Sequence, residues 1–256
     1  MIKFLIQKVN GNIVHDFVFT LLESCRYQNW VHNGTFVSTR FFNTKLNQKN
    51  FEFKPIHRNL VPVGSIEFVL AFTKHFYNCT PTPQNVPECL FRYANRNIFN
   101  GTEKDFSGHK FIKSNDIFKA KKENGEDVTG VYSFDDYNEQ YLPKGNYQIS
   151  DVIRIDAEYR CFVYRNTLAG IHYYSGDFTI FPNVKTITAM IDCFSTSCPI
   201  AYTLDIGVNE NNTFVIEVHD FFSCGLYGFA DHSIYPQMLF KWIWSNINKR
   251  YIWKQA

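Results

Sequence analysis

Hydrophobic and polar positions alternate along this chain in short runs that predict a mixture of strands and helices. The segment from Met1 to Lys8 is typical of a buried strand, and the remaining apolar runs in residues 1–60 predict mixed strands and loops. Ser65 is a suitable N-cap for a helix whose apolar spacing continues to Phe76. The same criteria predict strands at 108–113, 146–153, 158–164 and 168–174, a packing helix at 235–248, and loops at 79–87 and 119–130.

The most informative pattern is a predicted β-hairpin, in which two apolar runs flank an Asn-rich turn centred near Asn211. With that register Asp205 lies opposite Glu217 and Thr203 lies opposite His219, and all four side chains share one face. Neighbouring carboxylates repel each other, and a divalent cation with oxygen ligands compensates for the repulsion. The hairpin therefore predicts a metal site, and the alternative is a polar hairpin edge that faces solvent.

Basic residues at two other predicted strands are suited to phosphate chemistry. Lys113 ends one strand and Lys119 follows it closely, where each ammonium group can contact a phosphate as a point charge. The alternative is a pair of solvated surface lysines. Glu158 and Arg160 share one face of a later strand, where the arginine is suited to clamp a transferring phosphoryl group. The alternative there is a cross-strand ion pair of small energetic worth.

Composition narrows the class of protein without naming a function. The 256 residues suffice for one large domain or two modest ones. The net charge of +2 does not favour nucleic-acid binding, although 18% of the residues are aromatic. No apolar run reaches the length of a membrane span, and the early charges are atypical of a signal peptide. Seven cysteines in apolar contexts indicate reduced thiols and a cytoplasmic location, in a host cell if the source is viral.

Taken in order, these motifs resemble the ATP-grasp superfamily, and more narrowly a small clade of ATP-grasp domain proteins found often in phages and bacteria. The resemblance covers about residues 61–240. It rests on a Gly-Ser-x-Glu helix start, paired lysine motifs, a hinge strand, a Glu-x-Arg strand, and the metal hairpin with its closing Gly-Leu-Tyr-Gly. These lie respectively at 64–67, at 111–113 and 118–120, at 147–152, at 158–163, and at 205–220 with 225–228.

The resemblance implies an α+β ATP-grasp fold. An N-terminal α/β lobe, similar to a pre-ATP-grasp lobe, is expected at residues 1–90. The ATP-grasp region is expected at 91–256, with one α+β lobe at 91–150 and a second, carrying the metal hairpin, at 151–256. The two lobes are expected to clamp ATP between them.

The resemblance also implies roles for individual residues. The implied catalytic residues are Arg160, at the γ-phosphate or the developing acyl phosphate, and Lys119. The implied nucleotide-binding residues are Lys113, Lys119, Ile149, Ser150, Asp151, Val152 and Glu158. The implied ligands of Mg²⁺ are Asp205, Glu217 and His219. Arg92 or Arg96 is expected to supply a further phosphate contact, and the sequence does not choose between them.

Two departures from the family pattern bear on activity. His219 stands where the family usually has Asn, and imidazole suits softer divalent ions such as Mn²⁺ better than Mg²⁺. The histidine therefore indicates Mn²⁺, a water-mediated contact or weakened activity. Asp151 stands where a Glu is more usual, which leaves the ribose contact open.

The function implied is an ATP- and Mg²⁺-dependent, ADP-forming ligase that joins a carboxylate to an amine or similar nucleophile through an acyl phosphate. The acid and the acceptor, which is a small molecule, peptide or protein, are not identified by the sequence. One alternative is a non-catalytic ATP-grasp module that binds a nucleotide or a protein partner. Another is a nucleic-acid-modifying or -ligating enzyme, which the net charge does not favour. No membrane partner is expected.

Overall fold

The computed structural model describes residues 1–34, 36–81, 84–105, 107–115, 129–134, 142–210 and 212–252. Backbone contacts divide the chain into two compact units, which are described separately. The first unit is Met1–Pro81 with Pro199–Tyr202 and Phe221–Ala256, and the second is Thr82–Cys198 with Thr203–Asp220. The lobe boundaries expected at residues 90 and 150 stay predictions.

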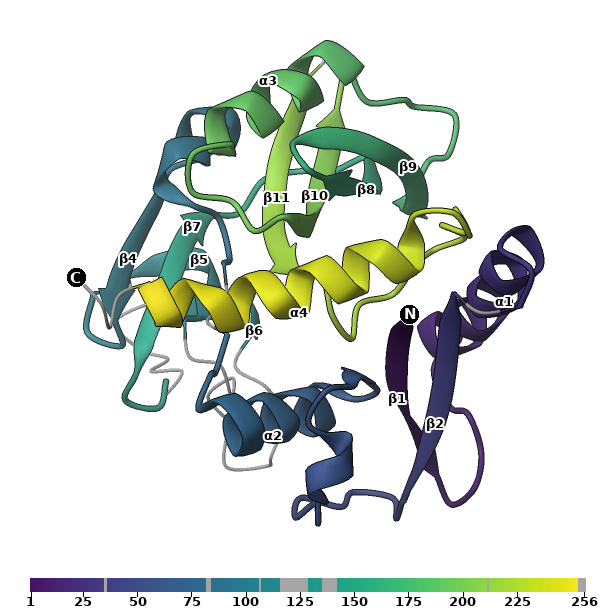
Figure 1. Cartoon of the computed structure of the whole chain (residues 1–256). Helices are drawn as coiled ribbons and strands as arrows, with labels where there is room; N and C mark the ends of the chain where they lie inside the picture. Colours follow the sequence, from purple (N-terminus) through teal and green to yellow (C-terminus); the bar gives the residue numbers. More distant parts are fainter. Residues whose placement is uncertain are drawn as a thin grey trace. The chain divides into compact units, whose positions relative to one another are not determined.

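The first unit contains a three-stranded parallel sheet in the order β2-β1-β3 (Figure 1). Its strands are β1 (Ile2–Val9), β2 (Val37–Thr44) and β3 (Val61–Val63). Its helices are α1 (Asp16–Val31), α2 (Ile66–Tyr77), α4 (Tyr235–Ile252) and the short 3-10 helix η1 (Pro55–His57). Phe4, Leu5 and Ile6 are buried because β1 is the central strand. The predicted first strand, the α2 helix and the C-terminal helix are confirmed.

Helix α1 corrects the prediction of only strands and loops before residue 60. Aromatic and β-branched residues, which favour strands, make up much of α1, and no side chain caps its start at His15. Helix α2, by contrast, carries the expected N-cap, because the Ser65 hydroxyl accepts a hydrogen bond from Phe68 N at 3.3 Å. It ends at Asn78, which adopts the left-handed conformation with φ of 48°.

The second unit contains two four-stranded sheets, in the orders β4-β7-β5-β6 and β11-β10-β8-β9 (Figure 1). The first sheet consists of β4 (Ile98–Thr102), β5 (Gly108–Ser114), β6 (Thr129–Phe134) and β7 (Asn146–Asp151). The second consists of β8 (Ala157–Tyr164), β9 (Thr167–Gly176), β10 (Ala201–Asn209) and β11 (Asn212–Asp220). Helices η2 (Glu88–Tyr93) and α3 (Val184–Phe194) complete the unit. The strands predicted at β5, β7, β8 and β9 are confirmed, while most of the predicted loop at 119–130 lies outside the described residues.

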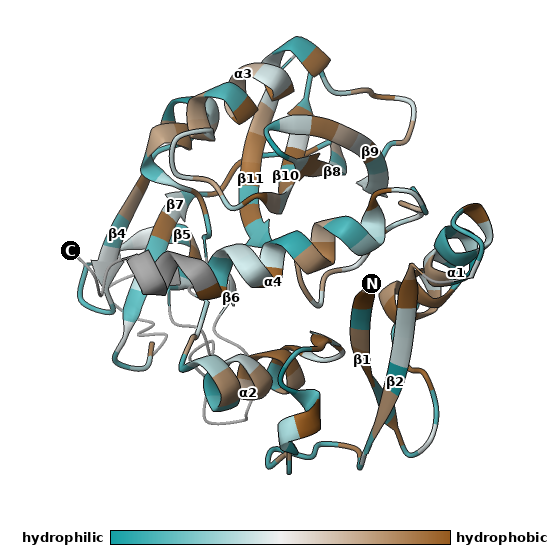
Figure 2. Ribbon diagram, viewed as in Figure 1, coloured by the Kyte–Doolittle hydropathy of each residue, from teal (hydrophilic) through white to brown (hydrophobic). Residues whose placement is uncertain are grey.

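The predicted hairpin is confirmed, because β10 and β11 are neighbours in their sheet. Strand β10 is buried along almost its whole length. Figure 2 shows that β11 is hydrophobic in its middle and hydrophilic towards its C-terminal end, where Glu217, His219 and Asp220 lie. The turn residue Asn211 lies outside the described residues. The hairpin thus carries polar groups on an otherwise apolar pair of strands.

Two further features concern the chain as a whole. No disulfide joins any of the seven cysteines, all of which fall in the described part of the chain. Three of them, Cys25, Cys79 and Cys161, are buried. Within the described residues, no helix has both the length and the apolar character needed to cross a membrane.

Candidate acidic and metal-ligating site

The three residues predicted as metal ligands lie together in the second unit. Asp205, Glu217 and His219 each place one ligand atom within 4.8 Å of the others. Glu217 and His219 are two residues apart on β11, so their side chains leave the same face of the strand. The Asp205 side chain on β10 is only 3% exposed. A solvent-facing polar edge is therefore the wrong description of this cluster, which we call the acidic cluster.

Each carboxylate of the acidic cluster has a basic partner. The Arg160 Nε and Nη2 atoms donate to the two oxygens of Asp205 at 2.8 and 2.7 Å, a bidentate pair whose side chains are both buried. Lys113 Nζ pairs with Glu217 Oε2, and His219 Nε2 contacts Glu217 Oε1. Two cations thus balance two carboxylates, which lowers the repulsion that close packing of like charges creates.

Arg160 lies on β8, next to β10, so its contact with Asp205 is a cross-strand ion pair, as one of the two predictions had it. Because the pair is buried, losing one partner costs far more than it would at the surface. Glu158, on the same strand, accepts a hydrogen bond from the Tyr174 hydroxyl at 2.8 Å. Burial, with the nearby Asp205 and Glu158 charges, raises the pKa of Tyr174, so the phenol remains a donor. The predicted contact of Arg160 with phosphate stays a prediction.

The two predicted phosphate lysines fare differently. Lys113, on β5, is largely buried with a side chain that is 12% exposed, so it is not a solvated surface lysine. Its ammonium group already lies at the acidic cluster. Lys119 lies outside the described residues, and its role stays a prediction.

The predicted hinge lies at the end of β7, between β4 and β5. Ile149 and Ser150 are paired with residues of both neighbouring strands, so their backbone groups belong to the sheet ladder. Asp151 is held by Lys110 Nζ at 2.5 Å and by Asn97 Nδ2 at 2.9 Å. Val152 follows the ladder and is 41% exposed. The backbone that a nucleotide can reach in the hinge therefore begins near Val152, and contacts to Ile149 and Ser150 would require other groups.

Lys110 is a charged partner that the sequence did not reveal. We expect Lys110→Met to lower the free energy of unfolding at about pH 7 by about 0.5–1 kcal/mol, as for other partly exposed ion pairs. The pKa of Asp151 is held below its ordinary value chiefly by the hydrogen bond from Lys110. A carboxylate of this kind stabilises the fold above its unfolded pKa, about 3.9, and the stabilisation is lost as pH falls through the lower folded-state pKa.

Urea titrations at about pH 7 and about pH 3 measure this effect, and the difference between variant and wild type should shrink at the lower pH. Lys104→Met, at an exposed lysine, is the matched control and should leave stability unchanged at both values. A Lys110→Met difference that is as large in acid as at neutral pH would contradict the assignment.

The structure separates the two arginines between which the sequence did not choose. Arg96 is partly buried, and its guanidinium donates to backbone carbonyls and to a serine hydroxyl. Arg92 is exposed, with Nη2 3.2 Å from Cys193 Sγ and its guanidinium 5.0 Å from the centre of the Tyr93 ring. Both line a pocket of about 470 Å³ that also includes Asp151. Of the two, Arg92 presents its charge to solvent, whereas Arg96 is committed to the protein backbone.

The acidic cluster has a donor set that fits a divalent cation. Two carboxylates and one imidazole are ligands for Mn²⁺ and, with the oxygens leading, for Mg²⁺. Thr203 precedes Asp205 by two residues on β10, so both side chains leave the same face. Its hydroxyl is fully buried and has no hydrogen-bond partner among the described residues. This unsatisfied hydroxyl adds a further oxygen on the ligand face of the strand.

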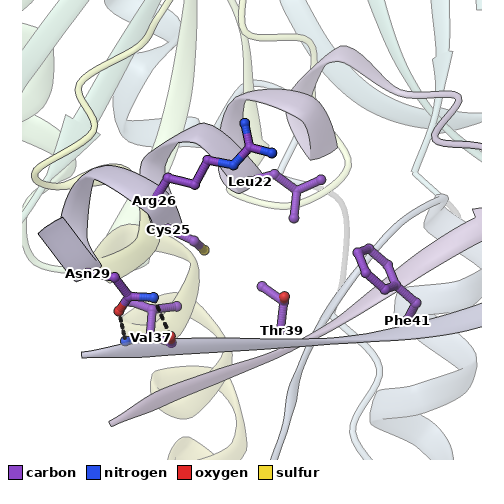
Figure 3. A pocket seen from close by; sticks show the side chains of 7 residues that line it. All are labelled: Leu22, Cys25, Arg26, Asn29, Val37, Thr39 and Phe41. Atoms are coloured by element: carbon purple, nitrogen blue, oxygen red, sulfur yellow. Dashed lines mark hydrogen bonds between the residues drawn. The ribbon is translucent and has the colours of Figure 1, made fainter. Parts of the chain in front are cut away.

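A second hollow lies in the first unit, between α1 and β2 (Figure 3). It has a volume of about 300 Å³ and is lined by Leu22, Cys25, Arg26, Asn29, Val37, Thr39 and Phe41. The Asn29 side chain bonds both backbone groups of Val37 at 2.8 Å, which ties the helix to the strand. Burial raises the pKa of the Cys25 thiol to about 12, so this thiol stays protonated. None of these seven lining residues is acidic, so the hollow lacks the cation-binding chemistry of the acidic cluster.

Comparison with known proteins gives one family and a set of similar folds. A family model described as an ATP-grasp domain, family 2 of its clade, matches residues 93–237. The structure of N5-carboxyaminoimidazole ribonucleotide synthetase from Thermotoga maritima is 11% identical, with a TM-score of 0.50, and the match covers 93% of this chain and 76% of that chain. D-alanine–D-alanine ligase from Bacillus anthracis is 11% identical over 100% of both chains, with a TM-score of 0.49. No curated protein matches the sequence. At these identities the structural likeness shows the fold alone.

Proposed function

This chain belongs to the ATP-grasp domains, in the second family of its clade, and we propose on that premise that it is an ATP-dependent ligase of carboxylates and amines. The α+β ATP-grasp fold implied by the resemblance is confirmed by the family match and by the similar fold of the Thermotoga maritima synthetase. The substrates and the ADP-forming chemistry belong to the proposal.

One observation carries the proposal: potential metal ligands and two basic side chains meet in a largely buried cluster. Asp205 and Glu217 supply carboxylate oxygens, and Lys113 and Arg160 bring positive charge to the same place. Phosphoryl transfer depends on positioning and on neutralising the charge of the transferring group, and both act more strongly away from water. A solvated surface cluster would not offer this.

In the proposed reaction, an oxygen of the substrate carboxylate attacks the γ-phosphorus of ATP, and the bond to the bridging oxygen breaks to release ADP. The amine then attacks the acyl carbon, and phosphate leaves with the electron pair of the C–O bond. Asp205, Glu217 and His219 would hold a divalent cation, which neutralises phosphate charge when bound. Lys113 would stabilise the transferring group as a point charge, exchanging its contact with Glu217 for a phosphate oxygen. Arg160 holds Asp205 in place through its two hydrogen bonds.

The second candidate function is a non-catalytic module that binds a nucleotide. It is favoured by the same ion pairs, because the Nε and Nη2 donors of Arg160 are already bonded to Asp205. Reaching a phosphate would then require the guanidinium to share or give up the carboxylate. A bound nucleotide that is never turned over is the behaviour expected of such a module.

Hydroxylamine trapping distinguishes the two functions. With ATP, Mn²⁺ or Mg²⁺, hydroxylamine and a panel of amino acids, dicarboxylates and short peptides, the ligase should release ADP and form a hydroxamate with one class of acid. The hydroxamate appears because hydroxylamine replaces the amine in attack on the acyl phosphate. ATP binding with no acid-dependent ADP release from any panel member would favour the non-catalytic module instead.

A further inference from the structure

Strand β11, which carries Glu217 and His219, lies at the edge of its sheet. One side of an edge strand has backbone groups with no partner strand, and such groups need other partners. Here Arg96 supplies two of them, because Nη1 donates to Val215 O at 2.9 Å and Nη2 donates to Ile216 O at 3.1 Å. These carbonyls immediately precede Glu217 in the chain. The guanidinium of Arg96 therefore holds the backbone next to the acidic cluster.

The same guanidinium also reaches the other sheet of the second unit. Its Nε atom donates to Ser150 Oγ on β7 at 3.3 Å, and Nη1 donates to Ala94 O at 3.0 Å. All four acceptors are uncharged. Burial lowers the pKa of Arg96 to about 10, so the side chain remains protonated at neutral pH. One planar group with several fixed donors thus joins the strand of the acidic cluster to the predicted hinge strand, a geometry that lysine cannot reproduce.

A second contact shows that this edge is held at more than one point. Val218 N, between the two side chains of the acidic cluster, donates to Asn85 O at 2.6 Å. The Asn85 side chain donates to Ser114 O at 3.1 Å, next to Lys113 on β5. Asn85 has φ of 46°, a left-handed conformation that asparagine tolerates well. Because Asn85 remains when Arg96 is replaced, β11 keeps an anchor in an Arg96 variant.

We propose that Arg96 is a positioning residue, which fixes Glu217 and His219 relative to the hinge strand so that cation and nucleotide meet in one geometry. The inference rests on the proposed function, since it concerns the same acidic cluster. Groups that orient metal ligands typically contribute about 10–100-fold to metal affinity, although they do not touch the metal. Displacements of about 1 Å at a reacting centre cost about 100-fold in rate.

The test compares Arg96→Met and Arg96→Lys with Arg92→Met, the matched control at an exposed arginine four residues earlier. Mn²⁺ binding with and without ATP is measured by electron paramagnetic resonance on folded protein, alongside the thermal midpoint. We expect both Arg96 variants to weaken Mn²⁺ binding by about 10-fold or more and Arg92→Met to leave it unchanged. Lysine should fail to rescue, because it keeps the charge and loses the planar fork. Should Arg96→Met not fold, Arg96→Lys carries the test.

The outcomes separate this inference from the proposed function. Wild-type protein that binds Mn²⁺ while the folded Arg96 variants bind it equally well would overturn the positioning role alone, even if their thermal midpoints fall. Full rescue by Arg96→Lys would overturn the role of the planar fork and so the proposal. Wild-type protein that binds no Mn²⁺, with or without ATP, would overturn the proposed function itself, and the role of Arg96 with it.

Discussion

Replacing Asp205 with Ala is expected to lower the free energy of unfolding by about 3–5 kcal/mol, because the change leaves Arg160 as an unbalanced buried charge. Both side chains of this pair are less than a tenth exposed, at 8% and 3%. The bidentate bonds that neutralise the guanidinium cannot be replaced by water at that depth. Urea denaturation followed by circular dichroism measures the loss.

Two companion variants make this prediction specific. Asp156→Ala removes a carboxylate whose partner, Arg154, has a side chain that is 82% exposed, and a much smaller loss is expected. Asp205→Ala combined with Arg160→Met removes both charges and should recover a large part of the stability, since apolar replacement of a buried pair is often close to neutral. A loss below about 1 kcal/mol for Asp205→Ala alone would contradict a buried, mutually dependent pair.

Replacing Glu217 with Gln is expected to abolish metal-dependent ATP turnover while the fold stays intact. The amide has the shape of the carboxylate but lacks its charge, so it is a poorer cation ligand and no longer pairs with Lys113. We expect turnover to fall by at least about 100-fold, the scale typical of removing one preorganised electrostatic group. Rates of ADP release and the thermal midpoint are measured on the same preparation.

The matched control for this variant is Glu23→Gln. Glu23 pairs with the exposed Arg26 on α1, in the first unit, so its loss should leave turnover unchanged. Full activity of Glu217→Gln would remove Glu217 from the proposed mechanism. A loss of activity shared by Glu23→Gln would point to a general effect of charge rather than to the acidic cluster.

The acidic cluster was within reach of the sequence because its parts follow a regular period. Alternation along two apolar strands placed Asp205 and Glu217 on one face, and burial of the surrounding valines and isoleucines implied that both would need partners. What the sequence left open was the identity of those partners. Arg160 and Lys113 were each predicted at a phosphate, and the structure shows each of them at a carboxylate of the cluster.

Other features carried no local signal. Arg96 bonds with Ser150 and Val215, which are 54 and 119 residues away in sequence, and no spacing rule links such positions. Lys110 and Asp151 become neighbours only through the pairing of β5 with β7. Helix α1 was missed for a different reason: its strand-favouring residues conceal a helix that tertiary packing stabilises, as the contact of Tyr235 Oη with Phe17 O at 3.1 Å illustrates.

The most direct test of the account is titration calorimetry of ATP into wild-type protein and Glu217→Gln, each with Mn²⁺, with Mg²⁺ and without a divalent cation. The account predicts that wild-type protein binds ATP in a metal-dependent way and that Glu217→Gln, though folded, loses the metal-dependent part. ATP binding that is the same without metal, that persists unchanged in Glu217→Gln, or that is absent under every condition would contradict it.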